Sequence, residues 1–91
     1  MSDWYVYVVR CRDGSLYTGI ATDLARRIRE HNVDDKRGAK YTRVRRPVEL
    51  VYWENCDTRS EAAKREHEIR QWSKPSKEAL IKDVRAADKP A

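Results

Sequence analysis

Apolar and polar positions near the start of the chain follow the pattern of a β-hairpin. Residues 4–10 are mostly aromatic or β-branched, as is usual in a strand. Asp13 and Gly14 supply turn chemistry, because glycine adopts positive φ angles without steric cost. Residues 16–20 then predict the returning strand, and residues 48–53 predict a third strand in which apolar and polar positions alternate only partly.

Helical spacing of apolar residues predicts the remaining elements. Leu24, Ile28 and His31 share one face of a first helix, which Thr22 is expected to cap with Asp23 as its first residue. A polar loop and a basic segment that ends at residue 47 separate this helix from the third strand.

Two further helices are predicted after the third strand. Thr58 and Glu61 match a capping box, which starts a helix that runs to about Trp72. Ser73 and Pro75 open a last helix, whose inward-facing residues are expected to be Ala79, Leu80 and Val84. The order ββαβαα predicts an α+β fold: a three-stranded antiparallel or mixed sheet flanked by helices.

Length and charge restrict the class of protein. The 91 residues suffice for one domain, expected over residues 1–85, with a disordered tail over residues 86–91. The 20 lysines and arginines outnumber the 15 acids, and a small basic domain often binds nucleic acid, although charge alone does not decide this. An acidic N-terminus, short apolar runs and two isolated cysteines predict a cytoplasmic protein without a disulfide framework or zinc knuckle.

Side chains suited to phosphodiester chemistry recur at regular spacing. Tyr17 follows Tyr7 by ten positions across the predicted turn, so the hairpin brings the two strands that carry them together. Arg27 follows after ten more and flanks the apolar stripe of the first helix, whereas Arg26 and Arg29 are expected to be solvated. Each tyrosine alone is compatible with an ordinary strand aromatic.

Glu66 lies on the apolar stripe of the second helix, between Ala62 and Ile69. A partly buried carboxylate needs a cation or a hydrogen bond, and either an arginine or Mg²⁺ meets that need. Zinc is less favoured, because His31 and His67 are far apart in the sequence and no pair of thiols accompanies them.

These residues together resemble a known family. Tyr5-Val6-Tyr7 and Tyr17-Thr18-Gly19 are similar to the GIY-YIG nuclease motif, and residues 24–32 resemble the basic helix of that family. The segment 38–42 and the later glutamate also match in order, so the resemblance covers residues 4–73 and is closest to small stand-alone bacterial members. Tyr5 replaces the first glycine of the motif and Thr18 its second isoleucine, but neither change removes a functional group.

The resemblance implies a metal-dependent endonuclease with one Mg²⁺ (or Mn²⁺) ion held by Glu66. Tyr17 would help to deprotonate the attacking water, and Arg27 would clamp the scissile phosphate. Tyr7 would hold the water or a phosphate oxygen, and His31 would form a hydrogen bond nearby. We expect the Tyr7 and Tyr17 hydroxyls, the Arg27 guanidinium and the Glu66 carboxylate to line one shallow concave surface.

The implied substrate is DNA, cleaved in repair or recombination, with RNA as an open alternative and a protein partner as a source of specificity. One alternative is a nucleic-acid-binding module with the nuclease fold and little or no activity, and a weaker one is a basic domain that binds a protein. The side chains expected to bind nucleic acid are Arg26, Lys40, Tyr41, Arg43, Arg45 and Arg46. The five cations among them are expected to form a continuous positive rim together with Arg27.

Overall fold

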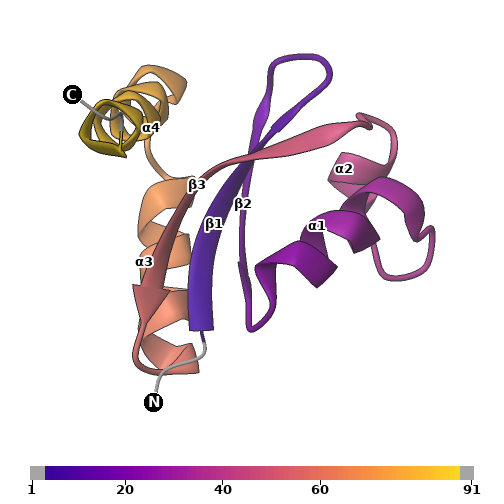
Figure 1. The fold of residues 1–91 in the computed structure, drawn as a ribbon, viewed down its shortest axis with the longest axis horizontal. Helices are drawn as coiled ribbons and strands as arrows, with labels where there is room; N and C mark the ends of the chain where they lie inside the picture. Colours follow the sequence, from indigo (N-terminus) through magenta and orange to yellow (C-terminus); the bar gives the residue numbers. More distant parts are fainter. Residues whose placement is uncertain (1–3, 89–91) are drawn as a thin grey trace.

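A three-stranded antiparallel sheet forms the centre of the domain. The computed structural model describes residues 4–88, and side chains up to residue 83. The strands are β1 (Trp4–Cys11), β2 (Leu16–Ala21) and β3 (Val48–Cys56), in the spatial order β2-β1-β3 (Figure 1). Strand β1 is therefore central and β2 is an edge strand.

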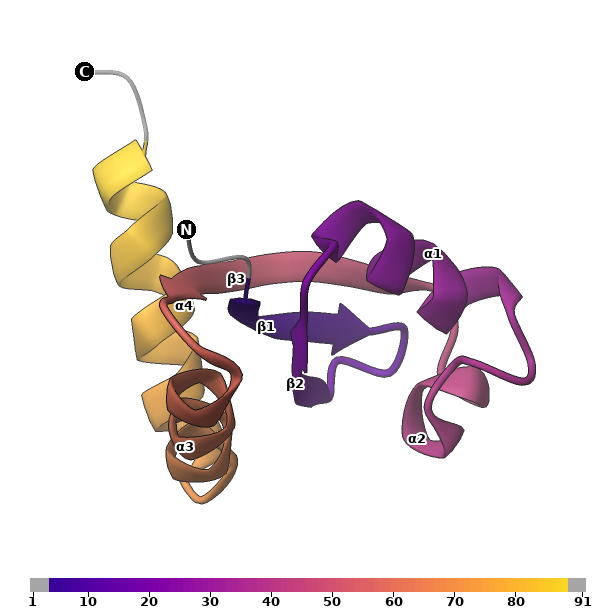
Figure 2. The same ribbon diagram turned by 90° about the horizontal axis from the view of Figure 1, so that it is seen from below.

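Helices lie on both sides of the sheet. Helices α1 (Leu24–Val33) and α2 (Lys40–Arg43) lie on one side, and α3 (Arg59–Arg70) and α4 (Lys74–Asp88) lie on the other (Figure 2). The predicted α+β fold is confirmed, and the sheet is antiparallel throughout. The observed order is ββααβαα, because the basic segment contains the short helix α2, which the sequence pattern did not indicate.

The hairpin turn forms as predicted. Gly14 has a φ of 86°, and its backbone N–H donates to the Cys11 carbonyl over 2.9 Å. The Asp13 carboxylate accepts the backbone N–H of Ser15 at 3.0 Å. The turn sets the register, in which Tyr7 pairs with Gly19 and the next same-face residue, Val9, pairs with Tyr17.

The sequence predicted the N-terminal cap of α3 correctly, but not that of α1. Thr58 caps α3 by accepting the backbone N–H of Glu61 at 3.1 Å, as predicted. The prediction for Thr22 is wrong, because Asp23 caps α1 by accepting the backbone N–H of Arg26 at 3.1 Å. A carboxylate suits the positive end of a helix, so α1 begins one residue later than expected.

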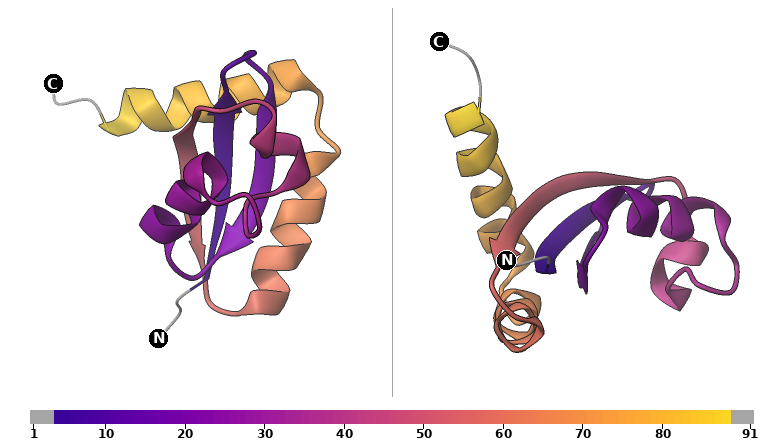
Figure 3. Two further views of the ribbon diagram at one scale, coloured as in Figure 1. Left: turned by 90° about the vertical axis from the view of Figure 1, so that its right-hand side faces the viewer. Right: turned by 60° about the horizontal axis from the view of Figure 1, so that its bottom comes forward.

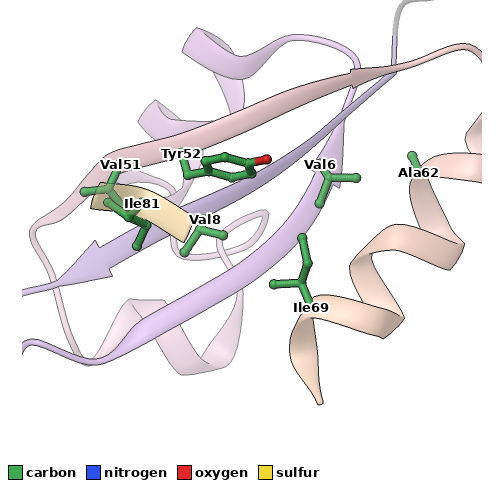
Figure 4. Close-up of a cluster of buried hydrophobic side chains, with 7 residues drawn as sticks. All are labelled: Val6, Val8, Val51, Tyr52, Ala62, Ile69 and Ile81. Atoms are coloured by element: carbon green, nitrogen blue, oxygen red, sulfur yellow. The ribbon is translucent and has the colours of Figure 1, made fainter. Parts of the chain in front are cut away.

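Both faces of β1 are buried, which explains its dense apolar sequence. The face toward α3 and α4 carries the larger apolar cluster (Figure 4), which consists of Val6, Val8, Val51, Tyr52, Ala62, Ile69 and Ile81. The face toward α1 carries a second cluster, which consists of Tyr7, Val9, Cys11, Ala21 and Val48. Tyr7, which the sequence predicts as a site residue, is thus part of the core rather than of the surface.

An irregularity in β3 explains its partial alternation. Val8 pairs with Tyr52 and Val9 with Leu50, so Val51 is an additional residue in a β-bulge. The bulge lets the consecutive residues Val51 and Tyr52 join the same apolar cluster.

Helix α4 is held on β1 by Arg10, which donates two hydrogen bonds to the Glu78 carboxylate at 2.8 and 2.6 Å. The prediction that Ala79 faces inward is wrong, because Ala79 is exposed and Ile81 is the buried residue. Helix α4 continues to Asp88, beyond the expected start of the tail, and residues 89–91 lie outside the described part. Among residues 4–88, no helix is both long and apolar enough to cross a membrane.

Candidate active site

The centre of the candidate site is a hydrogen bond between β1 and α1. The Tyr7 hydroxyl lies 2.7 Å from Nε2 of His31, and both side chains are almost completely buried. Tyr7 occupies the central strand, and His31 lies in the last turn of α1, so this contact fixes the helix against the sheet.

The short helix α2 supplies the second partner of His31. Nδ1 of His31 lies 2.8 Å from the Thr42 hydroxyl, which in turn donates to the Ala39 carbonyl at 3.1 Å. A hydroxyl has one proton and a carbonyl can only accept, so Thr42 must accept the proton of Nδ1. Nε2 then carries the lone pair, and the Tyr7 hydroxyl donates to it.

Burial keeps this pair neutral. Desolvation raises the pKa of Tyr7 to about 12, against a hydrogen bond from Arg27 and its positive charge, while the charges of Tyr17 and Glu66 raise it further. Desolvation also lowers the pKa of His31 to about 4, assisted by the positive charge of Arg27. At neutral pH a phenol therefore faces an uncharged imidazole.

Tyr17 lies on the other side of His31, on the edge strand. Its ring meets the imidazole edge-on at a centroid distance of 5.4 Å and stacks on the ring of Tyr41 at 5.9 Å. The Arg45 guanidinium covers the outer face of Tyr41 at 3.9 Å, and the Arg70 guanidinium lies 6.0 Å from the Tyr17 ring. The two aromatic rings are thus flanked by two cations.

Arg27 reaches the site from α1. Its Nη1 donates to the Glu30 carboxylate at 3.0 Å and to the Arg37 carbonyl at 2.6 Å. The guanidinium lies close enough to the Tyr7 hydroxyl to act on the pKa of that group. Arg26 shares the Glu30 carboxylate at 3.2 Å, but its side chain is 63% exposed against 26% for Arg27. The prediction that Arg27 flanks the buried side of the helix while its neighbour faces solvent is confirmed.

Glu66 approaches from α3, which runs alongside β2 (Figure 3). The residue is half-buried, and its charge contributes to the raised pKa of Tyr7, so the carboxylate lies near the tyrosine rather than on the far side of the helix. In the described part of the chain the Glu66 carboxylate forms no ion pair, whereas Glu54, Glu68 and Glu78 each pair with an arginine.

The donor set suits one hard cation. No group of three or more His, Cys, Asp or Glu side chains lies together within the described residues, so an all-protein cage is not present there. A single unneutralised carboxylate is compatible with Mg²⁺ or Mn²⁺, which keep water molecules and bind substrate phosphate. It does not fit a structural zinc site, which uses four protein ligands.

Gly19 lets the strands place Tyr7 correctly. A Cβ atom at this position would lie 2.4 Å from the Tyr7 hydroxyl oxygen and 2.6 Å from Cζ. Because Tyr7 and Gly19 are paired across the hairpin, the buried ring lies directly over the glycine backbone. The motif glycine is therefore required by packing.

The basic residues predicted to bind nucleic acid differ in their existing contacts. Arg46 donates to the His31 carbonyl at 2.6 Å and to the Asp35 carboxylate at 2.8 Å, so it serves the fold. Arg45 pairs with Asp13 at 3.2 Å. Exposed side chains that remain accessible on this side of the domain are Arg26, Lys40, Tyr41 and Arg43.

Three site residues were missing from the sequence prediction. Thr42 orients His31, Gly19 accommodates Tyr7, and Arg70 flanks Tyr17. Arg70 follows Glu66 by one helical turn, so the helical period could have indicated that they share a face. The pairing of Thr42 with His31 joins two separate helices, and no sequence period reports such a contact.

Comparison with known proteins agrees with this arrangement. Residues 3–79 match the family model described as the GIY-YIG catalytic domain. The chain belongs to the GIY-YIG family. The resemblance predicted from the sequence is confirmed, and the match to this GIY-YIG domain includes the positions of Tyr7 and Tyr17.

Relatives of this GIY-YIG domain occur in bacteria and in an archaeon. A UPF0213 protein of Desulfotalea psychrophila is 61% identical over 79 residues, which cover 87% of this chain and 71% of that protein. A UPF0213 protein of Haloquadratum walsbyi is 54% identical over 84 residues, which cover 91% of this chain and 92% of that protein.

Two solution NMR structures are also similar to the GIY-YIG domain. The structure of a protein from E. faecalis has a TM-score of 0.62 and 38% sequence identity, and the match covers 100% of this chain and 98% of that chain. A UPF0213 protein of Bacillus halodurans has a TM-score of 0.55 at 43% identity, with coverages of 87% and 82%. These similarities support the same fold.

Proposed function

We propose that this GIY-YIG domain is a metal-dependent endonuclease that hydrolyses phosphodiester bonds in DNA. The observation that carries the proposal is that Tyr17 contacts the buried Tyr7–His31 pair while the charges of Arg27 and of the unneutralised Glu66 carboxylate act on Tyr7. A binding module needs cations and aromatic rings, but it has no use for a carboxylate beside the phosphate path. The expected concave shape of this surface stays a prediction.

The two tyrosines are given different tasks. Tyr7 directs its proton into His31, so only its oxygen lone pairs face the site, where they can accept a hydrogen bond from water or from Arg27. Passing a proton inward is unfavourable, because the pKa of His31 is about 4. Tyr7 therefore positions the attacking water or the Arg27 guanidinium by accepting a hydrogen bond. Tyr17 assists deprotonation of the attacking water.

Arg27 and Glu66 supply the charged groups of the proposed mechanism. Arg27 is held near Tyr7 by Glu30 and the Arg37 carbonyl, and it clamps the phosphate as negative charge develops. Glu66 would hold one Mg²⁺ or Mn²⁺ ion. Such an ion would supply positive charge that stabilises the negative charge developing on the phosphate.

One observation favours the alternative of a binding module with little activity. Nη1 of Arg27 already contacts both Glu30 and the Arg37 carbonyl, so catalysis requires the guanidinium to share these contacts with phosphate. A module that only binds would keep them unchanged.

Incubation with plasmid, single-stranded, branched and RNA substrates tests the proposal. We expect cleavage with Mg²⁺ or Mn²⁺ and none with EDTA, and the substrate panel reports DNA against RNA. Binding without cleavage of every substrate with every divalent metal would support the module instead.

A further inference from the structure

Helix α3 carries two half-buried side chains, one on each side of its buried line. Ala62 and Ile69 are fully buried in the larger apolar cluster of the sheet (Figure 4). Arg65 and Glu66 are half-buried, and the other residues of α3 are exposed. A helix turns by about 100° per residue, so Arg65 and Glu66 leave α3 on opposite flanks of the line through its two buried residues.

The flank with Arg65 is anchored to β3. Nε and Nη2 of Arg65 donate to the two oxygens of the Glu54 carboxylate at 2.8 and 3.2 Å. The buried Tyr52 donates its hydroxyl to the same carboxylate, and the centre of the guanidinium lies 5.2 Å from the ring of Trp72. A bidentate pair fixes orientation as well as distance, so this contact resists rotation of the helix.

The flank with Glu66 has no such anchor. Among the described residues the Glu66 carboxylate is in no ion pair, and its charge acts on the phenol of Tyr7. The two buried residues, Ala62 and Ile69, lie on one line along α3, so their packing does little to prevent the helix from rolling about that line. A roll of about 10° would move a carboxylate that lies about 5–6 Å from the helix axis by about 1 Å.

We propose that the ion pair between Arg65 and Glu54 sets the rotation of α3 that presents Glu66 to the candidate active site. Arg65 and Glu54 are thus positioning residues, which act through Glu66 and do not touch the substrate. The inference rests on the proposed function, in which Glu66 would hold the metal ion. Glu68 also pairs with Arg65, but it lies on the same helix and therefore cannot set the rotation of that helix.

The chain contains a matched control for this ion pair. Arg10 on β1 donates to both oxygens of Glu78 on α4, at 2.8 and 2.6 Å. Arg10→Gln removes the same charge and the same kind of contact as Arg65→Gln, but from a helix that does not carry Glu66. Both variants should lower the melting temperature, so their comparison separates a loss of stability from a loss of position.

Nuclear magnetic resonance without metal tests the position of Glu66. Because the Glu66 charge acts on Tyr7, Glu66→Gln should shift the ring ¹³C signals of Tyr7. The same replacement should cause a smaller shift in an Arg65→Gln background and an unchanged shift in an Arg10→Gln background. Equal shifts in all three backgrounds would overturn the inference.

Titration with Mn²⁺ and single-turnover cleavage test the consequence for the site. Displacement of a functional group by about 1 Å can cost about a hundredfold in rate. We expect Arg65→Gln to lower the Mn²⁺ affinity and the rate at saturating DNA about tenfold or more, well below its melting temperature, whereas Arg10→Gln should change neither. Equal effects of the two variants would assign Arg65 a role in stability alone.

A double-mutant cycle excludes a general effect of charge. Glu54→Gln removes a negative charge where Arg65→Gln removes a positive one, and its amide oxygen can still accept the Tyr52 hydroxyl. If the pair acts as one unit, both variants should lose Mn²⁺ affinity to the same extent, and the double variant should lose no more. Opposite effects of the two variants, or losses that add, would contradict the inference.

Failure of this inference and failure of the proposed function give different results. A wild type that neither binds Mn²⁺ nor cleaves, but whose Tyr7 signals depend on Glu66 and Arg65 as expected, would refute the metal site and support the positioning. Cleavage and Mn²⁺ affinity that are unaffected by Arg65→Gln would support the nuclease and refute the positioning.

Discussion

The Tyr7 hydroxyl donates a hydrogen bond of 2.7 Å to Nε2 of His31 inside the core. Through this bond the central strand, α1 and, by way of Thr42, α2 are joined at one point. The orientation of the tyrosine is therefore fixed from inside the protein, and its oxygen lone pairs are left for the site.

Stability should fall as the pH decreases from about 6.5 toward 4. The pKa of His31 is lowered from 6.5 to about 4 by burial, so in this range the unfolded chain binds a proton that the folded protein does not. Between pH 7 and pH 5 the loss due to His31 is about 2 kcal/mol. Urea unfolding of the wild type and of His31→Gln at pH 7 and pH 5 measures this loss of unfolding free energy. The wild type should lose about 2 kcal/mol more than the variant, and equal losses would argue against a buried neutral imidazole.

Gly19→Ala should disrupt the packing of Tyr7. The added methyl carbon would lie 2.4 Å from the hydroxyl oxygen and 2.6 Å from Cζ of Tyr7, and both strands are held by their pairing. We expect a destabilisation of about 1–3 kcal/mol, as is typical of overpacking. Thermal unfolding is the measurement. Tyr7→Phe in the same chain should recover only part of the loss, because Cζ remains; full recovery would show that the hydroxyl alone is in conflict.

Much of the fold could be predicted because its signals are local. The turn at Gly14 depends on the conformational freedom of one residue, and the capping box of α3 spans four consecutive residues. Helix α2 could not be predicted in this way. It has four residues, too few for a helical period, and its role depends on Thr42 meeting a histidine from another helix.

In the site, too, only the features that follow from regular secondary structure could be predicted. The spacing of Tyr7, Tyr17 and Arg27 indicated which residues meet, because a hairpin and one helix face are regular structures. The bulge at Val51 and the contact between Gly19 and Tyr7 depend on how strands pack, and sequence periodicity does not report that packing. Arg46 was expected to bind nucleic acid on the basis of charge, but its contacts are with the end of α1.

Arg46 and Arg43 should behave differently when replaced by glutamine. Arg46→Gln removes hydrogen bonds to the His31 and Asp34 carbonyls, so we expect a loss of about 1–3 kcal/mol in the free energy of unfolding. Arg43→Gln alters an exposed side chain and should change stability by less than about 0.5 kcal/mol. It should instead reduce the slope of log affinity against log salt by about one. Urea unfolding and DNA titrations at several salt concentrations test both; a salt slope unaffected by Arg43→Gln would remove it from the phosphate path.

Glu66→Gln should separate catalysis from binding. The variant keeps the shape of the side chain and removes the charge proposed to hold the metal, so cleavage should fall at least about a hundredfold. Affinity for DNA should remain equal or rise slightly, since a negative charge near phosphate is gone. Glu68→Gln, on the same helix, is the matched control and should retain cleavage. Titration with Mn²⁺ reports metal binding directly, and cleavage that survives Glu66→Gln would refute the metal assignment even with the fold intact.

Arg27→Ala and Arg26→Ala form the sharpest matched pair, because both arginines lie on α1 and pair with Glu30. Only Arg27 also reaches Tyr7, and its side chain is much less exposed. If Arg27 stabilises the transition state, its removal should lower the rate of cleavage about a hundredfold or more while DNA affinity changes modestly. Removal of Arg26 should weaken binding slightly and leave the rate at saturating DNA nearly unchanged. Single-turnover cleavage at saturating protein measures this rate, and equal losses in the two variants would mean that Arg27 contributes only to the general attraction of phosphate.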